Sequence, residues 1–368
     1  MDGTEQGSAA LKEIFDRRRL VHIGTEAKAV WPEFDQARFL AHAARNLDDL
    51  GIMQRMRQVA EALRETLPLD FAKAAQILTA LAPRIGHAFA TISLCEYVAL
   101  YGKDDFETSM AALRHLTRFG TAEFAIRPFL QRDRERTLAV MRGWATDDNE
   151  HVRRLASEGS RPRLPWSFQL KALQADPSLA WPILERLKDD PSPYVRKSVA
   201  NHLNDISKDH PDWLLARLEA WPVERPNTRW IVGHALRTLI KKGDCRALAM
   251  VGSTGKPEVE VATFAVTPAR LALGERLMLA ATLRSIADAP QRLVVDYAIH
   301  YVKKNGGLSR KVFKLKRIEL APGADRSLSI SQTVRDFTTR SHNAGHHRVE
   351  LIVNGETLAE GGFDLVMP

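Results

Sequence analysis

The sequence predicts an all-α solenoid of helical repeats followed by an all-β sandwich, and three observations support this prediction. One segment in the middle of the chain occurs in variant copies, apolar residues before it recur at helical spacing, and apolar residues after about residue 255 alternate. Copies with periods of about 20 to 50 residues are typical of stacked helical pairs. We therefore expect a repeat domain over residues 1–255 and a sandwich domain over residues 256–368.

Helical spacing begins near Leu11 and continues to Val251. Phe39, Ala43 and Leu47 lie four residues apart, as one buried face of a helix requires. Proline removes a backbone donor and disfavours helix in the residue before it, so prolines mark the expected helix ends. These are Pro68, Pro83, Pro177 and Pro211.

Aligned copies of the repeated segment occupy residues 147–158, 189–200 and 228–236, at spacings of 43 and 33 residues. The copies share a stripe of apolar residues, which predicts the packed face of the stack. The matching positions are Val199 with Val232, Leu203 with Leu236, and Ile206 with Leu239.

The pattern changes after the turn-rich residues 252–257. Leu293, Val295, Tyr297 and Ile299 alternate with other residues, which is typical of a strand with one buried face. Turns are predicted at Asn305-Gly306-Gly307, Pro322-Gly323 and Asn354-Gly355. About seven short strands in this space favour an immunoglobulin-like sandwich.

Composition and charge favour a soluble, cytoplasmic protein. The start of the chain lacks the features of a signal peptide, no apolar run reaches membrane-spanning length, and two cysteines suggest no disulfide framework. The net charge of +8 permits a polyanionic partner. The segment from Arg292 to Arg317 contains eight Lys or Arg residues and, near them, a single Asp, Asp296. A solvated strand face also explains such a run.

Cations recur at matching positions of the copies. Arg153 and Arg154 match Arg196 and Lys197, and stacking would align them in a row along one face. Such a row can follow a phosphate backbone. An Arg at this position can equally pair with Asp147 or Asp190 between repeats. Further cations that extend the row are Arg229, Arg237, Lys241 and Lys242.

Two carboxylates mark where the copies differ. Glu158 takes the repeat position of Asn201, and Asp205 lies one turn further along the same face. Because packed helices are about 8–10 Å apart, we expect Glu158 and Asp205 to border one pocket of nucleoside size. Trp166 follows two prolines and is expected at its rim. Each residue alone also fits an ordinary role, as a solvated Glu, a capping Asp or a core Trp.

The chain resembles the AlkC branch of the AlkC/AlkD alkylpurine DNA glycosylases over nearly its whole length. The resemblance rests on residues 34–68, 119–127, 152–166, 195–206 and 234–239. The second and third stretches are specific, because a generic helical repeat does not need Glu158-Gly159 followed by Pro162, Pro165 and Trp166. The family implies HEAT-like repeats that wrap DNA, a following immunoglobulin-like domain, and removal of N-alkylated bases.

The resemblance places Glu123, Glu158 and Asp205 at the family's acidic active-site positions and Trp166 at its aromatic one. We expect a monofunctional DNA-3-methyladenine glycosylase of base excision repair, acting as a monomer on double-stranded DNA without a membrane or an obligate protein partner. The expected DNA-binding cations are Arg153, Arg154, Arg161, Arg163, Arg196, Lys197, Arg229, Arg237 and Lys241 in the repeats, and Lys303, Lys304, Arg310 and Lys311 at a hairpin that would complete a clamp.

A base alkylated at N3 of adenine is cationic and leaves without a general acid, so the carboxylates are expected to stabilise the sugar cation and to position water. No cofactor motif occurs, and we expect no metal at His342, His346 and His347, which have no acidic partner at ligand spacing. The alternatives are a non-catalytic protein that binds bent or branched DNA and a protein-binding scaffold. Lesion range, the division of roles among the carboxylates, and base flipping against DNA bending stay open.

Overall fold

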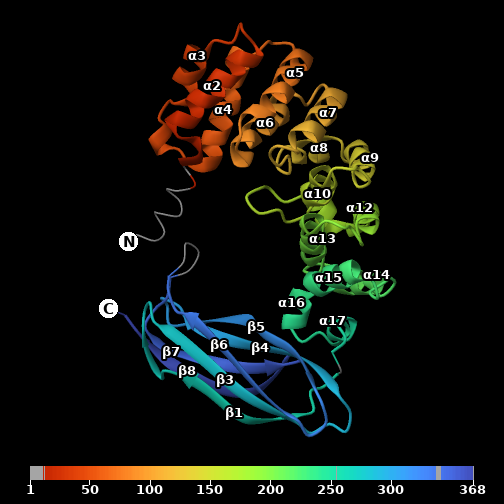
Figure 1. Cartoon of the computed structure of the whole chain (residues 1–368), viewed down its shortest axis with the longest axis vertical. Coiled ribbons are helices and arrows are strands. Elements are labelled where there is room, and N and C mark those ends of the chain that lie inside the picture. Colours follow the sequence, from red (N-terminus) through yellow and green to blue (C-terminus); the bar gives the residue numbers. More distant parts are fainter. Residues whose placement is uncertain (1–10, 12, 254, 337–340, 368) are drawn as a thin grey trace. The chain divides into compact units, whose positions relative to one another are not determined.

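The computed structural model describes residues 11, 13–253, 255–336 and 341–367, which form two compact units. The first unit contains the described residues up to His210 together with Trp221–Ala235. The second contains Pro211–Ala220 and the chain from Leu236 onward. Figure 1 shows the first as a stack of helices and the second as two layers of strands with short helices.

Short polar side chains start most helices of the first unit. Asp16, Asp35, Asp70, Asp105 and Asp133 each accept a hydrogen bond from a backbone N–H three residues later, which satisfies a donor in the first turn. The helices are η1 (Glu13–Phe15), α2 (Arg17–Val30), α3 (Gln36–Ala43), η2 (Leu47–Asp49), α4 (Ile52–Thr66), α5 (Phe71–Leu81), η3 (Ala82–Arg84), α6 (Ala88–Tyr101), α7 (Phe106–Leu116), α8 (Arg127–Arg132), α9 (Arg134–Trp144), α10 (Glu150–Gly159), α11 (Lys171–Ala175), η4 (Pro177–Leu179), α12 (Trp181–Arg186), α13 (Pro193–Ile206) and α15 (Pro226–Ala235).

The repeated segment forms matching helices. α10 begins after Asn149 and α13 after Ser192, and both side chains cap their helix at the same repeat position. α10 packs on α13, and α13 packs on α15. Val152, Val195 and Val199 are buried in these contacts. The predicted stack of helical pairs is confirmed.

Gly159 lets the end of α10 approach the segment before α8. A Cβ at this position would lie 2.5 Å from Ile126 Cγ2, far inside contact distance. The close approach brings residues 121–126 beside the last turn of α10. This explains the Glu158-Gly159 pair, because the glycine provides room beside the carboxylate.

The second unit is an immunoglobulin-like sandwich of two sheets. A three-stranded sheet has the order β1-β3-β6, and a five-stranded sheet has the order β2-β8-β7-β4-β5. All pairs are antiparallel except β2 with β8. The strands are β1 (Val259–Thr267), β2 (Arg270–Ala272), β3 (Arg276–Ser285), β4 (Gln291–Val302), β5 (Leu308–Leu320), β6 (Asp325–Thr333), β7 (Gly345–Val353) and β8 (Glu356–Val366).

The sandwich core follows the predicted alternation. Leu293, Val295, Tyr297 and Ile299 of β4 are buried in the two apolar clusters between the sheets. The described residues form eight strands, one more than the seven expected, because the three-residue β2 is too short to produce an alternating pattern. The predicted fold class, a HEAT-like helical region followed by an immunoglobulin-like sandwich, is confirmed.

Three helices belong to the same compact unit as the strands: α14 (Pro211–Leu218), α16 (Arg237–Lys241) and α17 (Cys245–Met250). The turn between α16 and α17 packs closely on the turn between β7 and β8, because a Cβ on Gly355 would be 2.2 Å from the Gly243 Cα.

The secondary structure changes near the predicted boundary at residue 255, whereas the compact unit changes earlier, at Leu236. Within the described part of the chain, the helices are too short or too polar to span a bilayer.

Candidate active site

Two carboxylates meet on one guanidinium where α10 ends. Glu158 is in the last turn of α10, and Asp205 is in the last turn of α13. Arg161, in the loop after α10, donates from Nη1 to Glu158 Oε1 at 2.7 Å and from Nε to Asp205 Oδ2 at 2.9 Å. All three side chains are buried. The structure therefore brings together the two carboxylates that the repeat alignment placed on neighbouring helices.

The third predicted carboxylate joins the same cluster through a second guanidinium. Arg154 Nη1 lies 2.5 Å from Glu123 Oε2, and Arg154 Nη2 lies 3.7 Å from Glu158 Oε1. Thr121 Oγ1 donates to Glu123 Oε2 at 2.7 Å. Glu123, Arg154, Glu158, Arg161 and Asp205 thus form an alternating series of anions and cations, which we call the charged cluster.

The cations of the charged cluster keep their charge despite burial. Burial lowers the pKa of Arg154, but Glu123 and Glu158 outweigh it, so that this pKa lies above its ordinary value. Burial also lowers the pKa of Arg161, but the charges of Glu158 and Asp205 outweigh it, so that this pKa is raised as well. Both guanidinium groups therefore supply fixed positive charge beside the carboxylates.

A polar layer from α13 supports Glu158. Ser198 Oγ donates to Glu158 Oε2 at 2.6 Å. His202 Nδ1 lies 3.0 Å from the Ser157 carbonyl oxygen, so this nitrogen carries the proton and donates. Burial, and next to it the charge of Arg161, lower the pKa of His202 to about 3, which keeps the ring neutral. Ser198 thus fixes the orientation of the Glu158 carboxylate, and His202 holds the backbone of the preceding residue.

The donors of the charged cluster do not use all of its acceptor positions. Lys208 Nζ lies 3.2 Å from Asp205 Oδ1, but the Lys208 side chain is 42% exposed and can leave. A carboxylate accepts about four hydrogen bonds. The arrangement can therefore hold a water or a positively charged group against preorganised oxygens.

Trp166 lies in the same loop as Arg161, between α10 and α11. Its side chain is 63% exposed and its backbone has φ of 62°, a region that favours glycine. The loop between α10 and α11, yellow-green in Figure 1, projects from the side of α10 and α13 opposite α9 and α12. A strained, solvent-exposed Trp contributes little to folding, which supports a role in binding.

Arg127 anchors the loop that carries Trp166, and no sequence pattern indicated this. It is fully buried and donates to three carbonyl oxygens: Gly159 at 3.1 Å, Arg161 at 2.8 Å and Phe168 at 2.5 Å. Burial, followed by repulsion from Arg161, lowers the pKa of Arg127 to about 10. One guanidinium thus ties both ends of the loop to α8. The signal available in the sequence was Arg127 at the end of a stretch shared with the family.

Exposed aromatic residues accompany the cations of the repeats. Arg154 Cζ lies 4.9 Å from the centre of the exposed Tyr194 ring, and Arg196 Cζ lies 6.0 Å from that of Trp230. Cation–π contacts of this length hold an arginine without consuming all of its donors. The sequence alone does not indicate Tyr194 or Trp230 as binding residues, because an isolated aromatic residue within a helical segment predicts core.

The repeated arginines Arg153, Arg196 and Arg229 support the loops before their own helices. Each donates to the backbone oxygens five and six residues earlier, at 2.8 to 3.1 Å. Arg153 also pairs with the buried Asp190 of the next repeat at 2.7 Å. The inter-repeat pairing considered for this position therefore occurs, while DNA contact by these residues stays a prediction.

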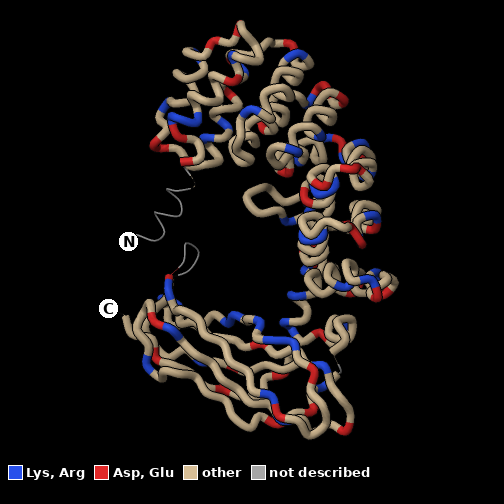
Figure 2. The backbone as a smooth tube through the Cα atoms, in the orientation of Figure 1, with Lys and Arg blue, Asp and Glu red and all other residues tan. Residues whose placement is uncertain are grey.

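The remaining predicted cations differ in their surroundings. Arg163 pairs with Asp209 at 2.7 Å, and Lys241 Nζ donates to the Val312 carbonyl oxygen at 2.9 Å. Lys197 is exposed and forms no ion pair with another described residue. Arg237 lies at the start of α16. Figure 2 shows Lys and Arg interspersed with Asp and Glu along the helical stack.

The predicted hairpin connects β4 to β5. Lys303 and Lys304 lie in its exposed turn, and Lys311 is exposed on β5. Arg310 pairs with the buried Glu350 at 2.8 Å. Among the three histidines considered for metal, His342 bonds Asp336 and His346 bonds Asp364, so they do not converge. Searched over the described residues, the chain holds no cluster of three or more metal-ligating side chains.

A helical-repeat unit with buried carboxylates, followed by an immunoglobulin-like unit, defines a class of DNA-repair protein. Residues 50–239 match the family described as DNA alkylation repair enzyme, and residues 260–367 match the C-terminal Ig-like domain of the uncharacterised protein YhaZ. The chain belongs to the DNA alkylation repair enzyme family. The predicted resemblance is confirmed.

Two relatives cover almost the whole chain. The uncharacterized protein YhaZ of Bacillus subtilis (strain 168) is 41% identical over 349 residues, which is 95% of this chain and 97% of that protein. The alkylpurine DNA glycosylase AlkC of Pseudomonas fluorescens, solved bound to DNA containing an abasic site analog, is 56% identical with a TM-score of 0.94. The match covers 97% of this chain and 99% of that one.

Proposed function

We propose that this protein is a monofunctional DNA glycosylase that hydrolyses the N-glycosidic bond of cationic N-alkylated bases, such as 3-methyladenine, in duplex DNA. The observation that carries the proposal is the pair of buried carboxylates, Glu158 and Asp205, held by one Arg161. The exposed Trp166 lies in the same loop as Arg161. The similar AlkC protein bound to abasic DNA supports it, because abasic DNA is what a glycosylase leaves behind.

Hydrolysis of a cationic base needs little help at the leaving group. When the C1′–N bond breaks, its electron pair neutralises the base, and positive charge moves to the sugar. Glu158 and Asp205 stabilise this charge and position a water, whose oxygen bonds C1′ while its proton passes to a carboxylate. Glu123 supports the water or the cationic base, and the face of Trp166 contacts the sugar or base.

The guanidinium groups of the charged cluster have a further consequence for specificity. In the absence of substrate, Arg154 and Arg161 compensate two of the three carboxylates of the charged cluster, and the partly exposed Lys208 pairs with Asp205. A cationic base or sugar then adds attraction to acceptor positions that the arginines leave open. A neutral lesion gains no such attraction, and we expect it to be released slowly.

Base release tests the proposal. The protein is incubated with methylated duplex DNA and free 3-methyladenine is measured, in parallel with release of a neutral ethenoadenine. We expect fast release of the cationic base, slow release of the neutral one, and loss of both in Asp205→Asn. Base release by neither wild type nor variant, with duplex binding intact, would instead favour the non-catalytic protein that binds bent or branched DNA.

Binding to duplex DNA involves both units in this proposal. The repeat cations and the exposed turn at Lys303 and Lys304 contact phosphates, and each contact releases counterions. We expect Lys303→Gln with Lys304→Gln to reduce the salt dependence of duplex binding. An unchanged salt slope would remove the hairpin from the interface without affecting the catalytic assignment.

A further inference from the structure

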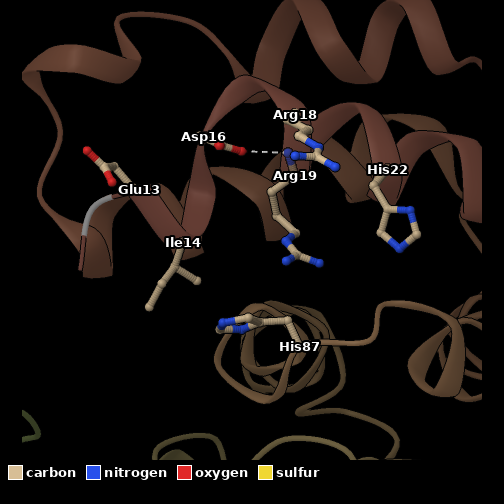
Figure 3. A pocket seen from close by; sticks show the side chains of 7 residues that line it. All are labelled: Glu13, Ile14, Asp16, Arg18, Arg19, His22 and His87. Atoms are coloured by element: carbon tan, nitrogen blue, oxygen red, sulfur yellow. Dashed lines mark hydrogen bonds between the residues drawn. The ribbon is translucent and has the colours of Figure 1, made fainter. Parts of the chain in front are cut away.

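A cavity lined mainly by charged and polar side chains lies away from the charged cluster, at the start of the helical stack. It has a volume of about 600 Å³ and lies between the beginning of α2 and the beginning of α6. Figure 3 shows Arg18, Arg19 and His22 from α2 above the cavity and His87 below it. None of these residues belongs to the sites described so far.

The two arginines of this cavity have donors to spare, whereas His22 Nε2 already donates to the Arg84 carbonyl oxygen at 3.1 Å. Arg18 is exposed and forms no ion pair within the part of the chain that the structure describes. Arg19 uses Nη1 to bond the Ile85 carbonyl oxygen at 3.0 Å, which fixes the guanidinium at the cavity wall. Its remaining N–H groups are available to a ligand. Two guanidinium groups at one cavity favour a phosphate or another bidentate anion.

The histidine at the beginning of α6 adds a donor of defined position. His87 Nδ1 accepts a hydrogen bond from the Ala90 backbone N–H at 3.3 Å and so caps the helix. Because Nδ1 is the acceptor, a neutral ring carries its proton on Nε2. Figure 3 shows the ring lying beneath Arg19, at the edge of the cavity.

The two acidic residues of the lining do not cancel this preference. Asp16 accepts the Arg19 backbone N–H at 2.6 Å and is committed to capping α2. Figure 3 shows Glu13 on the side opposite Arg18 and His22. An anion can therefore bind at the arginine and histidine side of the cavity, away from Glu13.

The cavity lies along the same stack as the charged cluster, with one segment between them. Gly120 packs on the first turn of α6, where a Cβ would be 2.4 Å from the Ala88 oxygen. Thr121 and Glu123 follow directly and contact Arg154 of α10. Residues 120–123 therefore connect the start of α6, at the cavity, to the charged cluster.

We infer that the cavity formed by Arg18, Arg19, His22 and His87 binds a backbone phosphate of the duplex on one side of the lesion. The inference rests on the proposed function for its ligand, duplex DNA. It assigns the N-terminal helices a role in holding DNA, separate from the chemistry at Glu158 and Asp205.

The test compares Arg18→Gln with Arg17→Gln, which removes the same charge one residue earlier on α2 without lining the cavity. Binding to a duplex with an abasic analog is measured against salt concentration. We expect Arg18→Gln to weaken binding about three- to tenfold and to lower the salt slope by about one, with Arg17→Gln near wild type. Equal effects of the two variants, or none from either, would overturn the inference.

A second variant keeps the fold in place. His87→Asn retains a side chain that can cap α6 but removes the Nε2 donor, and it should weaken binding in the same direction. Shortening one flank of the duplex to three base pairs should abolish the difference between Arg18→Gln and wild type. If the difference persists with both flanks short, or if a nucleoside monophosphate protects wild type but not Arg18→Gln against heat while duplex binding is equal, the duplex assignment is wrong.

Failure of this inference and failure of the proposed function are distinguishable. At sub-saturating protein, the single-turnover rate of base release should fall in Arg18→Gln in proportion to its weaker binding, whereas Arg17→Gln should match wild type. A wild-type protein that releases no base but shows the Arg18 effect on duplex binding would retain the phosphate site and lose the glycosylase assignment.

Discussion

The first turns of α10, α13 and α15 and the last turns of α10 and α13 come from the same repeated sequence but use charge differently. At the first turns, Arg153, Arg196 and Arg229 repeat and make the same backbone contacts. At the last turns the copies differ, with Glu158 opposite Asn201 and the buried Asp205 one turn further. Repeated charges support the scaffold, and charges that depart from the repeat gather in the proposed active site.

The largest expected effect is on the rate of base release, when a carboxylate that departs from the repeat is removed. Asp205→Asn removes one of the two carboxylates on Arg161, and we expect the single-turnover rate of 3-methyladenine release to fall about 10²- to 10³-fold. Asp209→Asn is the matched control, since Asp209 lies one turn further and pairs with Arg163 outside the charged cluster. A folded Asp205→Asn protein that releases base at the wild-type rate would remove Asp205 from the chemistry.

Substituting Arg127 tests whether its guanidinium anchors the loop that carries Trp166. Arg127→Lys keeps the charge but cannot reach three carbonyl oxygens, so we expect a loss of about 2–3 kcal/mol in the free energy of unfolding. Arg132→Lys, on the same helix, changes an exposed guanidinium paired with Asp104 and should cost under about 0.5 kcal/mol. Denaturant unfolding measures both, and equal losses would contradict the anchoring role.

His202 is a further residue at which the copies differ, because Gly159 and Ala235 occupy its repeat position. Its imidazole ring is buried and titratable. Its pKa of about 3 lies below the ordinary value of 6.5, so the unfolded chain binds a proton between these pH values and the folded chain does not. Stability contributed by neutral His202 is therefore lost as pH falls. Between pH 6.5 and 4.5, wild type should lose about 2 kcal/mol more than His202→Gln in urea unfolding. If the free energies of unfolding of wild type and His202→Gln change with pH in parallel, the pKa of His202 is not lowered in the folded protein.

Trp166 should show the smallest change in stability. Trp166→Gly relieves the positive φ, so we expect the free energy of unfolding to stay equal or to rise by up to about 1 kcal/mol, while base release slows about tenfold. Trp166→Phe should recover part of the rate because it restores an aromatic face. A marked loss of stability in Trp166→Gly would mean that the ring supports the fold.

Much of the fold could be predicted from the sequence, because helical and strand periodicity are local properties. The alignment of the copies also placed Glu158 and Asp205 on neighbouring helices, since it carries spacing information across 43 residues. It could not place Arg161, which lies in a loop outside the repeat and bonds both carboxylates.

Contacts between distant segments were also beyond the sequence. Arg127 reaches oxygens 32 to 41 residues away, and Arg19 reaches Ile85, 66 residues away. No periodicity encodes such pairings, because they depend on how loops close between packed helices. The repeated arginines illustrate the converse, since their spacing was clear but their backbone contacts could not be separated from DNA binding by pattern alone.

The comparison is tested most directly on a single helix, α10, by measuring base release and unfolding for Arg153→Gln and Glu158→Gln. Arg153→Gln leaves the buried Asp190 unpaired and should lower the free energy of unfolding by about 2–4 kcal/mol. The single-turnover rate of the folded variant, measured at saturating protein so that any loss of DNA binding does not count, should stay within about threefold of wild type. Glu158→Gln should lose about 100-fold or more in rate at a temperature where circular dichroism shows it folded. Equal rate losses in the two variants would contradict the separation of scaffold from chemistry.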